Sequence, residues 1–308
     1  SEFVEGKEFS IRKIEPGGFV GAETDHQTWN NNYETFFGFQ LGDKGFIFGL
    51  DNSLIDIKWF TQEVYADGTL APDEAAGGEW DNYYEYATPI YSNGQTFLFF
   101  QNSKTKYWFI THVYDDGTLH DVCDGHWGNV WERVTSVETG DNSYLFGLDD
   151  TSADWFLQRM DYTGHLDEET DQGTWSHTFK FMVGYTLLEQ AYLFGAKGNF
   201  DYNQHYFIQE ITPDGKMGVE TDNGSIEEPD YVVPFKVYDK PDSFRYTIGW
   251  NMSKTNGNPT GWSARHDGTW RGYFKTGGGA ALANIDGDPG HIQDALMMGI
   301  EDLHGADR

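Results

Sequence analysis

One pattern recurs four times in this chain of 308 residues, and it limits the possible folds more than any other feature. Each copy opens with a tryptophan, continues with a short apolar run and an aromatic run, and closes on a glycine turn. The opening residues are Trp29, Trp80, Trp127 and Trp175, which lie 51, 47 and 48 residues apart. Because the order of parts is the same in every copy, the chain contains an internal repeat.

A period of this length, with room for four short strands and no helical pattern, is typical of a propeller blade. A single four-stranded sheet cannot bury both faces, so blades stack radially against one another. Runs such as YLFG at Tyr144 indicate inner strands that are covered on both faces. Asp-Gly pairs such as Asp116-Gly117 suit two-residue hairpin turns. We therefore predict an all-β fold, a β-propeller of four-stranded blades, in which the recurring aromatic residues pack blade against blade.

The two ends of the chain predict how the ring closes. Residues 11–25, IRKIEPGGFVGAETD, match residues 208–222, IQEITPDGKMGVETD, without a gap and are identical at 8 of 15 positions. The N-terminal stretch is therefore the second half of a blade whose first half comes from elsewhere in the chain. We expect the segment from Ser10 to Glu23 to pair with strands after residue 277, so that N- and C-terminal strands share one blade and no edge stays exposed.

Two resemblances extend this interpretation. The segments PDSFRYTIGWNMSKTNGNPTGWS, from Pro241, and GGGAALANIDGDPGHIQDALMMGIED, from Gly277, resemble FG-GAP repeats, the blades of integrin α-chain-like propellers. The first four units resemble the tectonin and tachylectin type of lectin propeller in period, aromatic content and a Gly-x-Trp ending. Both resemblances imply a propeller.

We expect a single domain over residues 1–308, with about six blades. The predicted units are 29–79, 80–126, 127–174, 175–227, 228–276, and 277–308 joined to 1–28. Five blades are the alternative, if the C-terminal tail packs outside the ring.

The start of each unit carries a candidate ligand site. Three units repeat a tryptophan, an asparagine two residues later, an aromatic residue four later, and then a glutamate. An aromatic ring can stack on a sugar while an amide and a carboxylate bind its hydroxyl groups. The candidate residues are Trp29, Asn31, Tyr33, Glu34, Trp80, Asn82, Tyr84, Glu85, Trp127, Asn129, Trp131 and Glu132. The alternative is structural: the asparagine caps a turn and the glutamate binds backbone amides. The fourth unit has His177 and Lys180 at these positions, so we expect it to have lost any such site.

A second candidate site is a calcium loop near the C-terminus. Oxygen ligands at alternate positions around a glycine bend can wrap a calcium ion. The candidate ligands are Asn284, Asp286, Asp288 and Asp294. The FG-GAP resemblance implies calcium in such a loop. This sequence departs from the family pattern by having Asn284 at the first position and two extra residues before Asp294. The alternative is a turn without a metal ion.

Composition and missing motifs narrow the function. Fifty acidic residues against twenty basic ones give a formal charge of −30, which argues against a nucleic-acid partner. No run of 18 apolar residues is present, so no membrane span is predicted. The single cysteine, Cys123, excludes an internal disulfide framework. No nucleophile elbow, zinc-protease motif or P-loop occurs, although propeller glycosidases need only two or three carboxylates at the channel mouth.

We therefore predict a non-catalytic, lectin-like or adhesive propeller that binds a glycan or glycoconjugate through repeated sites. Several weak equivalent sites would give avidity. The first alternative is a protein-binding module of a larger secreted, surface or toxin-like protein. The second alternative is a glycoside hydrolase. The expected location is secreted or at the extracellular surface.

Overall fold

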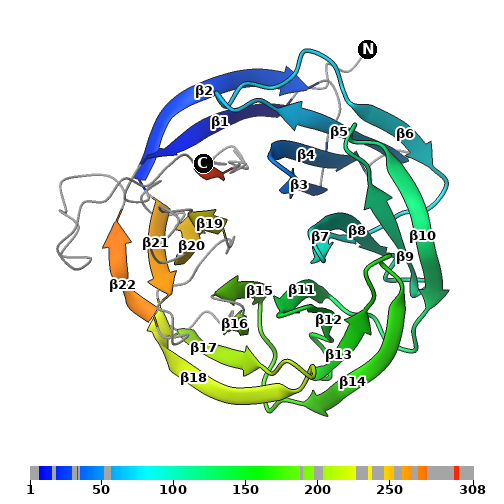
Figure 1. Cartoon of the computed structure of the whole chain (residues 1–308), viewed down its shortest axis with the longest axis vertical. Coiled ribbons are helices and arrows are strands. Elements are labelled where there is room, and N and C mark those ends of the chain that lie inside the picture. Colours follow the sequence, from blue (N-terminus) through cyan, green and yellow to red (C-terminus); the bar gives the residue numbers. More distant parts are fainter. Residues whose placement is uncertain are drawn as a thin grey trace, which may run out of the picture.

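The computed structural model describes residues 7–15, 19–29, 33, 35–51, 57–187, 190–197, 204–226, 235–237, 246–252, 259–264, 270–275 and 295–297. Within these ranges the 23 strands form six sheets, which are arranged in a ring (Figure 1). No described segment is a helix that could cross a membrane.

Five sheets are complete blades of four antiparallel strands. Blade 1 contains β3 (Thr35–Leu41), β4 (Lys44–Asp51), β5 (Ile57–Val64) and β6 (Ala76–Trp80). Blade 2 contains β7 (Tyr86–Ser92), β8 (Gln95–Gln101), β9 (Tyr107–Val113) and β10 (Leu119–His126). Blade 3 contains β11 (Arg133–Thr139), β12 (Asn142–Leu148), β13 (Asp154–Met160) and β14 (Leu166–Thr174). Blade 4 contains β15 (Phe181–Leu187), β16 (Gln190–Ala196), β17 (Gln204–Ile211) and β18 (Met217–Ile226). Blade 5 contains β19 (Phe235–Val237), β20 (Tyr246–Met252), β21 (Pro259–Ala264) and β22 (Trp270–Lys275).

The sixth sheet closes the ring and confirms the prediction from the chain ends. Strand β1 (Lys7–Glu15) pairs with β2 (Phe19–Trp29) on one side and with β23 (Ala295–Met297) on the other. Arg12 lies opposite Met297 in this register. The fold is therefore a six-bladed propeller, and the five-bladed alternative is wrong.

Each of the five four-stranded blades runs from the centre of the ring outward in chain order, whereas in the sixth sheet the C-terminal β23 lies inside β1 and β2 (Figure 1). Strands β3, β7, β11, β15 and β19 surround the centre, and β6, β10, β14, β18 and β22 lie on the outside. Because neighbouring strands are antiparallel, the start of a blade's first strand and the turn between its second and third strands lie at the same end of the ring. We call this the entry end.

The burial pattern of the strands follows this arrangement. Strand β8 is buried at every residue after the first, because neighbouring blades cover both of its faces. The outer strand β10 has only partly buried and exposed residues. The core consequently lies between blades: one cluster joins Phe48 and Leu50 of blade 1 to Leu98 and Phe100 of blade 2.

The glycine turns differ from the predicted two-residue type. At the turn after β9, the Gly117 N–H donates to the Tyr114 carbonyl at 2.7 Å, and the Tyr114 N–H donates to the Thr118 carbonyl at 2.9 Å. Only the glycine of this turn has a positive φ, 83°. The loop therefore has three residues and ends in a left-handed glycine, one of the common hairpin connections.

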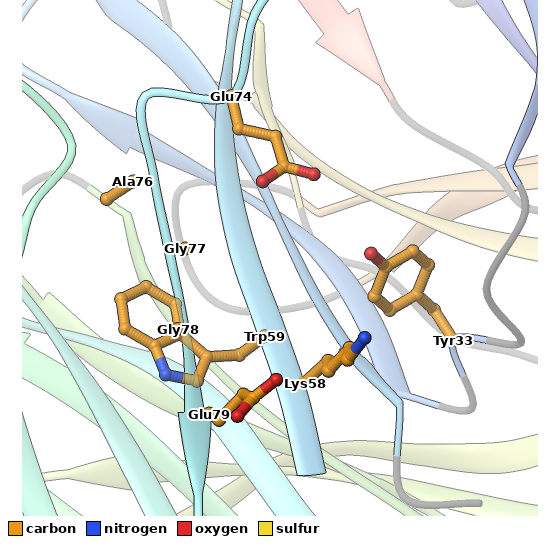
Figure 2. Close-up of a pocket in the computed structure, with 8 residues that line it drawn as sticks. All are labelled: Tyr33, Lys58, Trp59, Glu74, Ala76, Gly77, Gly78 and Glu79. Atoms are coloured by element: carbon orange, nitrogen blue, oxygen red, sulfur yellow. The ribbon is translucent and has the colours of Figure 1, made fainter. Parts of the chain in front are cut away.

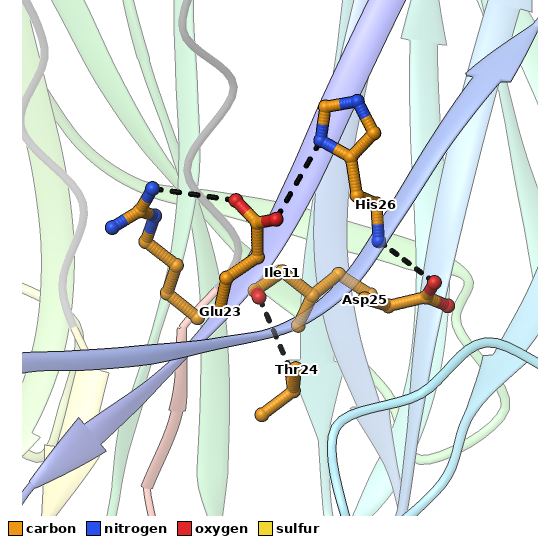
Figure 3. Close-up of polar contacts among 6 residues, drawn as sticks. Ile11, Glu23, Thr24, Asp25 and His26 are labelled. Atoms are coloured by element: carbon orange, nitrogen blue, oxygen red, sulfur yellow. Dashed lines mark hydrogen bonds and ion pairs between the residues drawn. The ribbon is translucent and has the colours of Figure 1, made fainter.

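These turns also lock each blade to its neighbour, which explains the repeated Glu-Thr-Asp sequence. The Thr24 hydroxyl of β2 donates to the Gly68 carbonyl of blade 1 at 2.8 Å and to the Ile11 carbonyl at 3.1 Å, the second contact being drawn in Figure 3. The adjacent Asp25 carboxylate accepts the Leu70 N–H at 2.8 Å. Two side chains of one blade thus hold the turn of the next.

The same lock recurs between blades 3 and 4. The Thr170 hydroxyl donates to the Gly215 carbonyl at 2.7 Å, and Asp171 accepts the Met217 N–H at 2.8 Å. A Cβ atom at position 215 would lie 2.2 Å from the Tyr144 ring, so the close approach of the turn requires glycine.

Candidate functional site

The tryptophans that open the repeats lie in the connections between blades. Trp80 is the last residue of β6, and Trp127 and Trp175 directly follow β10 and β14. The Trp127 ring stacks on Trp108 of blade 2 at a centroid distance of 5.0 Å and meets Phe156 of blade 3 edge-on at 5.3 Å. These rings therefore join neighbouring blades by burial and aromatic contact.

The aromatic residue four positions later packs in the same way. Tyr84 is only 5% exposed, and its ring meets Phe109 edge-on at 4.8 Å. The Trp131 ring meets Phe156 edge-on at 4.7 Å. Rings packed in this way do not present an open face on which a sugar could stack.

The repeated glutamates bind the turn at the entry end of their own blade. The Glu85 carboxylate accepts the Ser103 N–H at 2.8 Å and the Ser103 hydroxyl at 2.6 Å. The Glu132 Oε2 atom accepts the Asp150 N–H at 2.9 Å. Ser103 and Asp150 each lie in the turn between the second and third strands. These contacts account for the repeated glutamate without a ligand.

The remaining predicted members are more scattered. Asn82 and Asn129 are exposed at the entry end. Asn82 forms a side-chain hydrogen bond with Tyr84, which opposes the rise in the pKa of that phenol caused by burial. In the first unit, Trp29 is the last residue of β2, and the Tyr33 ring meets Phe60 edge-on at 4.6 Å.

Several predicted site residues cannot be placed. Those that lie outside the described residues are Asn31, Glu34, Asn284, Asp286, Asp288 and Asp294. The calcium loop therefore stays a prediction. Among the described residues, no three histidine, cysteine or acidic side chains are grouped so as to hold a metal ion.

One junction of the ring breaks the repeat. The strand register places Arg133, the first residue of β11, where other blades have Thr35, Tyr86 and Phe181. The same register places Asp150 where blade 2 has Ser103. The Arg133 Nη2 atom lies 2.7 Å from the Asp150 Oδ2 atom. Blade 3 therefore combines a guanidinium and an extra carboxylate at its entry end, beside Glu132, whereas blade 2, the other blade in which both positions are described, has Tyr86 and Ser103.

The environment of Asp150 favours its protonated form. Burial is the largest effect on Asp150, and it raises the pKa of this carboxyl group. The Arg133 guanidinium lowers the pKa, the charges of Glu132 and Asp149 raise it further, and the result is about 6. The Asp150 side chain keeps 26% of its surface exposed. Burial, followed by the charge of Glu132, also raises the pKa of Tyr86, the first residue of β7. A carboxyl group with a pKa near neutrality can donate a proton at physiological pH.

Several polar atoms at the same junction are buried without a hydrogen-bond partner among the described residues. They are Asp150 Oδ1, Arg133 Nε, Gln101 Nε2 and Trp131 Nε1. Gln101 is completely buried, and its Oε1 atom accepts the backbone N–H of Trp131 at 3.1 Å. The equivalent positions in other blades are Leu50, Leu148 and Ala196. An unsatisfied buried polar atom costs stability, and four of the seven such atoms among the described residues lie at this junction.

Our sequence analysis missed Arg133, Asp150 and Gln101, because it searched for what the units share. A search for what one unit changes could have found them. The position after the repeated glutamate is occupied by Thr35, Tyr86, Arg133 and Phe181 in the four units. Only the third is charged.

Away from this junction, a groove lies on the outer strands of blade 1. It has a volume of about 600 Å³, and Lys58 extends between Tyr33 and Glu79 along it, with Glu74 at one end (Figure 2). Burial raises the pKa of Glu74. The groove is open, and its floor includes Gly77 and Gly78 of β6 rather than the inner strands.

The sequence matches no family model and no curated protein. Several solved structures are similar in fold. A 6-phosphogluconolactonase-like protein from Bacteroides fragilis superposes with a TM-score of 0.54 at 11% identity, over 87% of this chain and 78% of that chain. A protein from Lactobacillus plantarum has a TM-score of 0.52 at 12% identity, over 89% and 79% of the two chains. An exo-β-1,3-galactanase from Phanerochaete chrysosporium, solved with β-1,3-galactotriose, has a TM-score of 0.50 at 11% identity, over 86% and 70%.

At this identity the similarities show the propeller fold alone. The FG-GAP and tectonin resemblances are not tested by them and stay predictions. The prediction of a non-catalytic, lectin-like propeller is corrected, because the similar structures that act on sugars are those of enzymes. The described aromatic rings on which that prediction depended are packed against neighbouring rings.

Proposed function

We propose that this protein is a glycoside hydrolase in which Asp150 is the general acid. The observation that carries the proposal is the pair of Arg133 and Asp150, 2.7 Å apart beside Glu132 at the entry end of blade 3, and the raised pKa of Asp150, about 6, supports it. A single catalytic centre needs one place in the ring that differs from the others. Blade 3 provides such a place.

The roles follow from the contacts. Protonated Asp150 would donate its proton to the glycosidic oxygen as the bond from that oxygen to the anomeric carbon breaks. Glu132 supplies a second carboxylate, which would take one proton from a water molecule as the water oxygen bonds to the anomeric carbon. Glu132 then releases its proton to solvent and Asp150 takes one up, which restores both groups. Arg133 holds Asp150 in place through its 2.7 Å contact.

The similar structures support the choice of bond to test first. One is an exo-β-1,3-galactanase solved with β-1,3-galactotriose. Another is 6-phosphogluconolactonase-like, so the ester bond of a sugar lactone is the second bond to test. Action on a glycan would agree with the predicted extracellular location.

The test is turnover by the whole chain. We expect release of p-nitrophenol from at least one p-nitrophenyl glycoside, or of reducing ends from a β-linked galactan. Asp150→Asn should lower kcat/KM by about 100-fold or more, the usual range for loss of a general acid. Asp149→Asn is the matched control, because Asn102 occupies the same turn position in blade 2. Its activity should stay within about threefold of wild type.

Three outcomes decide the proposal. No turnover of glycosides by a folded protein would reject it, and turnover of sugar lactones alone would replace glycosidase by lactonase. Turnover that survives Asp150→Asn would remove Asp150 from the role of general acid.

A further inference from the structure

A polar groove lies at the entry end next to the turn that carries Asp150. Its volume is about 360 Å³. The residues used below are Thr151, Ser152, Trp175, His177, Thr178 and Lys197, all of which line it. Thr151 and Ser152 directly follow Asp150 in the chain, so the groove starts beside the proposed catalytic carboxyl group.

The groove lies where a lysine side chain extends in blade 2. In blade 2, the turn between the second and third strands ends at Lys106, whose ammonium group donates to the Gly128 carbonyl. In blade 3 the equivalent residue is Ala153, which has the same φ of 60°. Both residues also accept a backbone N–H from the tryptophan of the next connection, Trp127 and Trp175 respectively. The backbone is therefore conserved between the two junctions, and the missing side chain leaves the space open.

The charges at this junction are reversed relative to the junction before it. Lys197 follows β16 at the position where Asp149 follows β12. In the connection before β15, Lys180 takes the position that Glu132 has before β11. His177 replaces Asn129 in the same connection. Two lysines therefore replace two acidic residues at this junction, on a chain whose formal charge is −30, and one of them, Lys197, lines the groove.

We propose that this groove binds the anionic group of an acidic sugar, either the carboxylate of a uronic acid or a sugar phosphate. The Lys197 ammonium group would bind the anion, and the hydroxyl groups of Thr151, Ser152 and Thr178 would bind sugar hydroxyls. The rest of the ligand would extend toward Asp150. This inference deepens the proposed function by naming the substrate class, but binding in the groove does not require turnover.

The test is a calorimetric titration of the full chain carrying Asp150→Asn, which prevents turnover. The probes are digalacturonate, galactose 6-phosphate and the neutral methyl galactoside. We expect one of the two anionic probes to bind at least about tenfold more tightly than the neutral sugar, with an affinity that falls as salt is added. The tighter of the two anionic probes identifies the anion. Lys197→Gln should weaken this binding about tenfold and leave the neutral sugar unaffected.

Two further variants separate groove shape from charge. Ala153→Lys should place a side chain where Lys106 lies in blade 2, and so should weaken anion binding although it adds a positive charge. Lys106→Ala should open the equivalent space at the junction between blades 2 and 3. That junction has Asp149 at the position of Lys197, so the variant should create no anion binding. A normal melting temperature for each variant shows that the fold is intact.

The results distinguish the two proposals. Equal affinity for neutral and anionic probes would overturn the groove assignment, as would affinity that survives both Lys197→Gln and Ala153→Lys. Turnover of neutral glycosides alone would keep the hydrolase and overturn the acidic substrate. Tight anion binding without turnover by the wild-type protein would keep the groove as an anion-binding site and overturn the hydrolase.

Discussion

The junction between blades 2 and 3 and the junction between blades 3 and 4 have almost the same packing. Trp127 meets Phe156 edge-on at 5.3 Å with an interplanar angle of 61°, and Trp175 meets Phe207 at 5.2 Å and 71°. The next aromatic residue of each connection lies 4.7 Å from the same phenylalanine, at 65° and 63°. The rings therefore set the spacing of the blades in the same way twice.

The polar residues around these rings differ completely. The first junction has Glu132 and Asp149, and the second has Lys180 and Lys197 at the equivalent positions. The tryptophan positions are constrained because each ring contacts aromatic rings of two blades, so removing the ring would leave a cavity. The polar positions touch solvent and can change charge at little cost. Function can therefore diverge between blades while the scaffold repeats.

The largest expected effect tests the shared packing. Trp127→Ala and Trp175→Ala should each lower the free energy of unfolding by about 3–5 kcal/mol, because each removes a ring that fills the space between two blades. Urea denaturation measures both. The exposed Tyr162 (66% exposed) provides a control, since Tyr162→Ala should cost less than about 0.5 kcal/mol. A difference of more than about 2 kcal/mol between the two tryptophan variants would mean that the junctions are not equivalent.

The next largest effect concerns Asp150, and it tests the difference between the junctions through the pH dependence of the unfolding free energy. Because burial raises the pKa of Asp150 from about 4 in the unfolded chain to about 6, folding favours the protonated carboxyl group. This contribution to stability is complete below about pH 4 and is lost as the pH rises through about 6.

Asp150→Asn cannot titrate. The decline in unfolding free energy between about pH 4 and pH 7 should therefore be smaller in this variant than in wild type, by on the order of 1–3 kcal/mol. Urea denaturation at the two pH values measures the difference, and Asp149→Asn is the comparison that should lose only a small part of the decline, because Asp149 raises the pKa of Asp150 less than burial and Glu132 do. Identical profiles for wild type and Asp150→Asn would show that the Asp150 environment is ordinary.

The smallest effect tests the glutamates of the repeat. Glu85→Gln should lower the free energy of unfolding by about 1 kcal/mol, because Ser103 then loses a charged acceptor for its N–H and hydroxyl groups. Lys180→Gln should change it by less than about 0.5 kcal/mol. Thermal melts compare the two. If Lys180→Gln is as costly as Glu85→Gln, the unit of blade 4 has kept a structural role at this position.

Much of the fold could be predicted from particular sequence features. The match of residues 11–25 to residues 208–222 predicted that the chain ends share a blade, and the pairing of β1 with β23 confirms it. The turn type was predicted incorrectly, because Asp116-Gly117 is compatible with two hairpin loops and only the hydrogen bonds of Tyr114 distinguish them.

The candidate site was less accessible. The tryptophan, asparagine and glutamate set was correctly found as a repeat, but the sequence could not show which side of each ring is covered. Tyr84 is a residue type that can stack on a sugar, but in this structure it is buried like a core residue.

The sequence by itself determined the scaffold of this protein. The period of the repeat, the continuous apolar runs and the matching chain ends are local patterns, and each has one main structural solution. Only the tertiary structure decided the chemistry of the entry end. Arg133 and Asp150 lie 17 residues apart in the chain and meet only because a hairpin returns β12 to the start of β11. Burial is the largest cause of the raised pKa of Asp150, and burial is a property of the folded chain rather than of any segment of sequence.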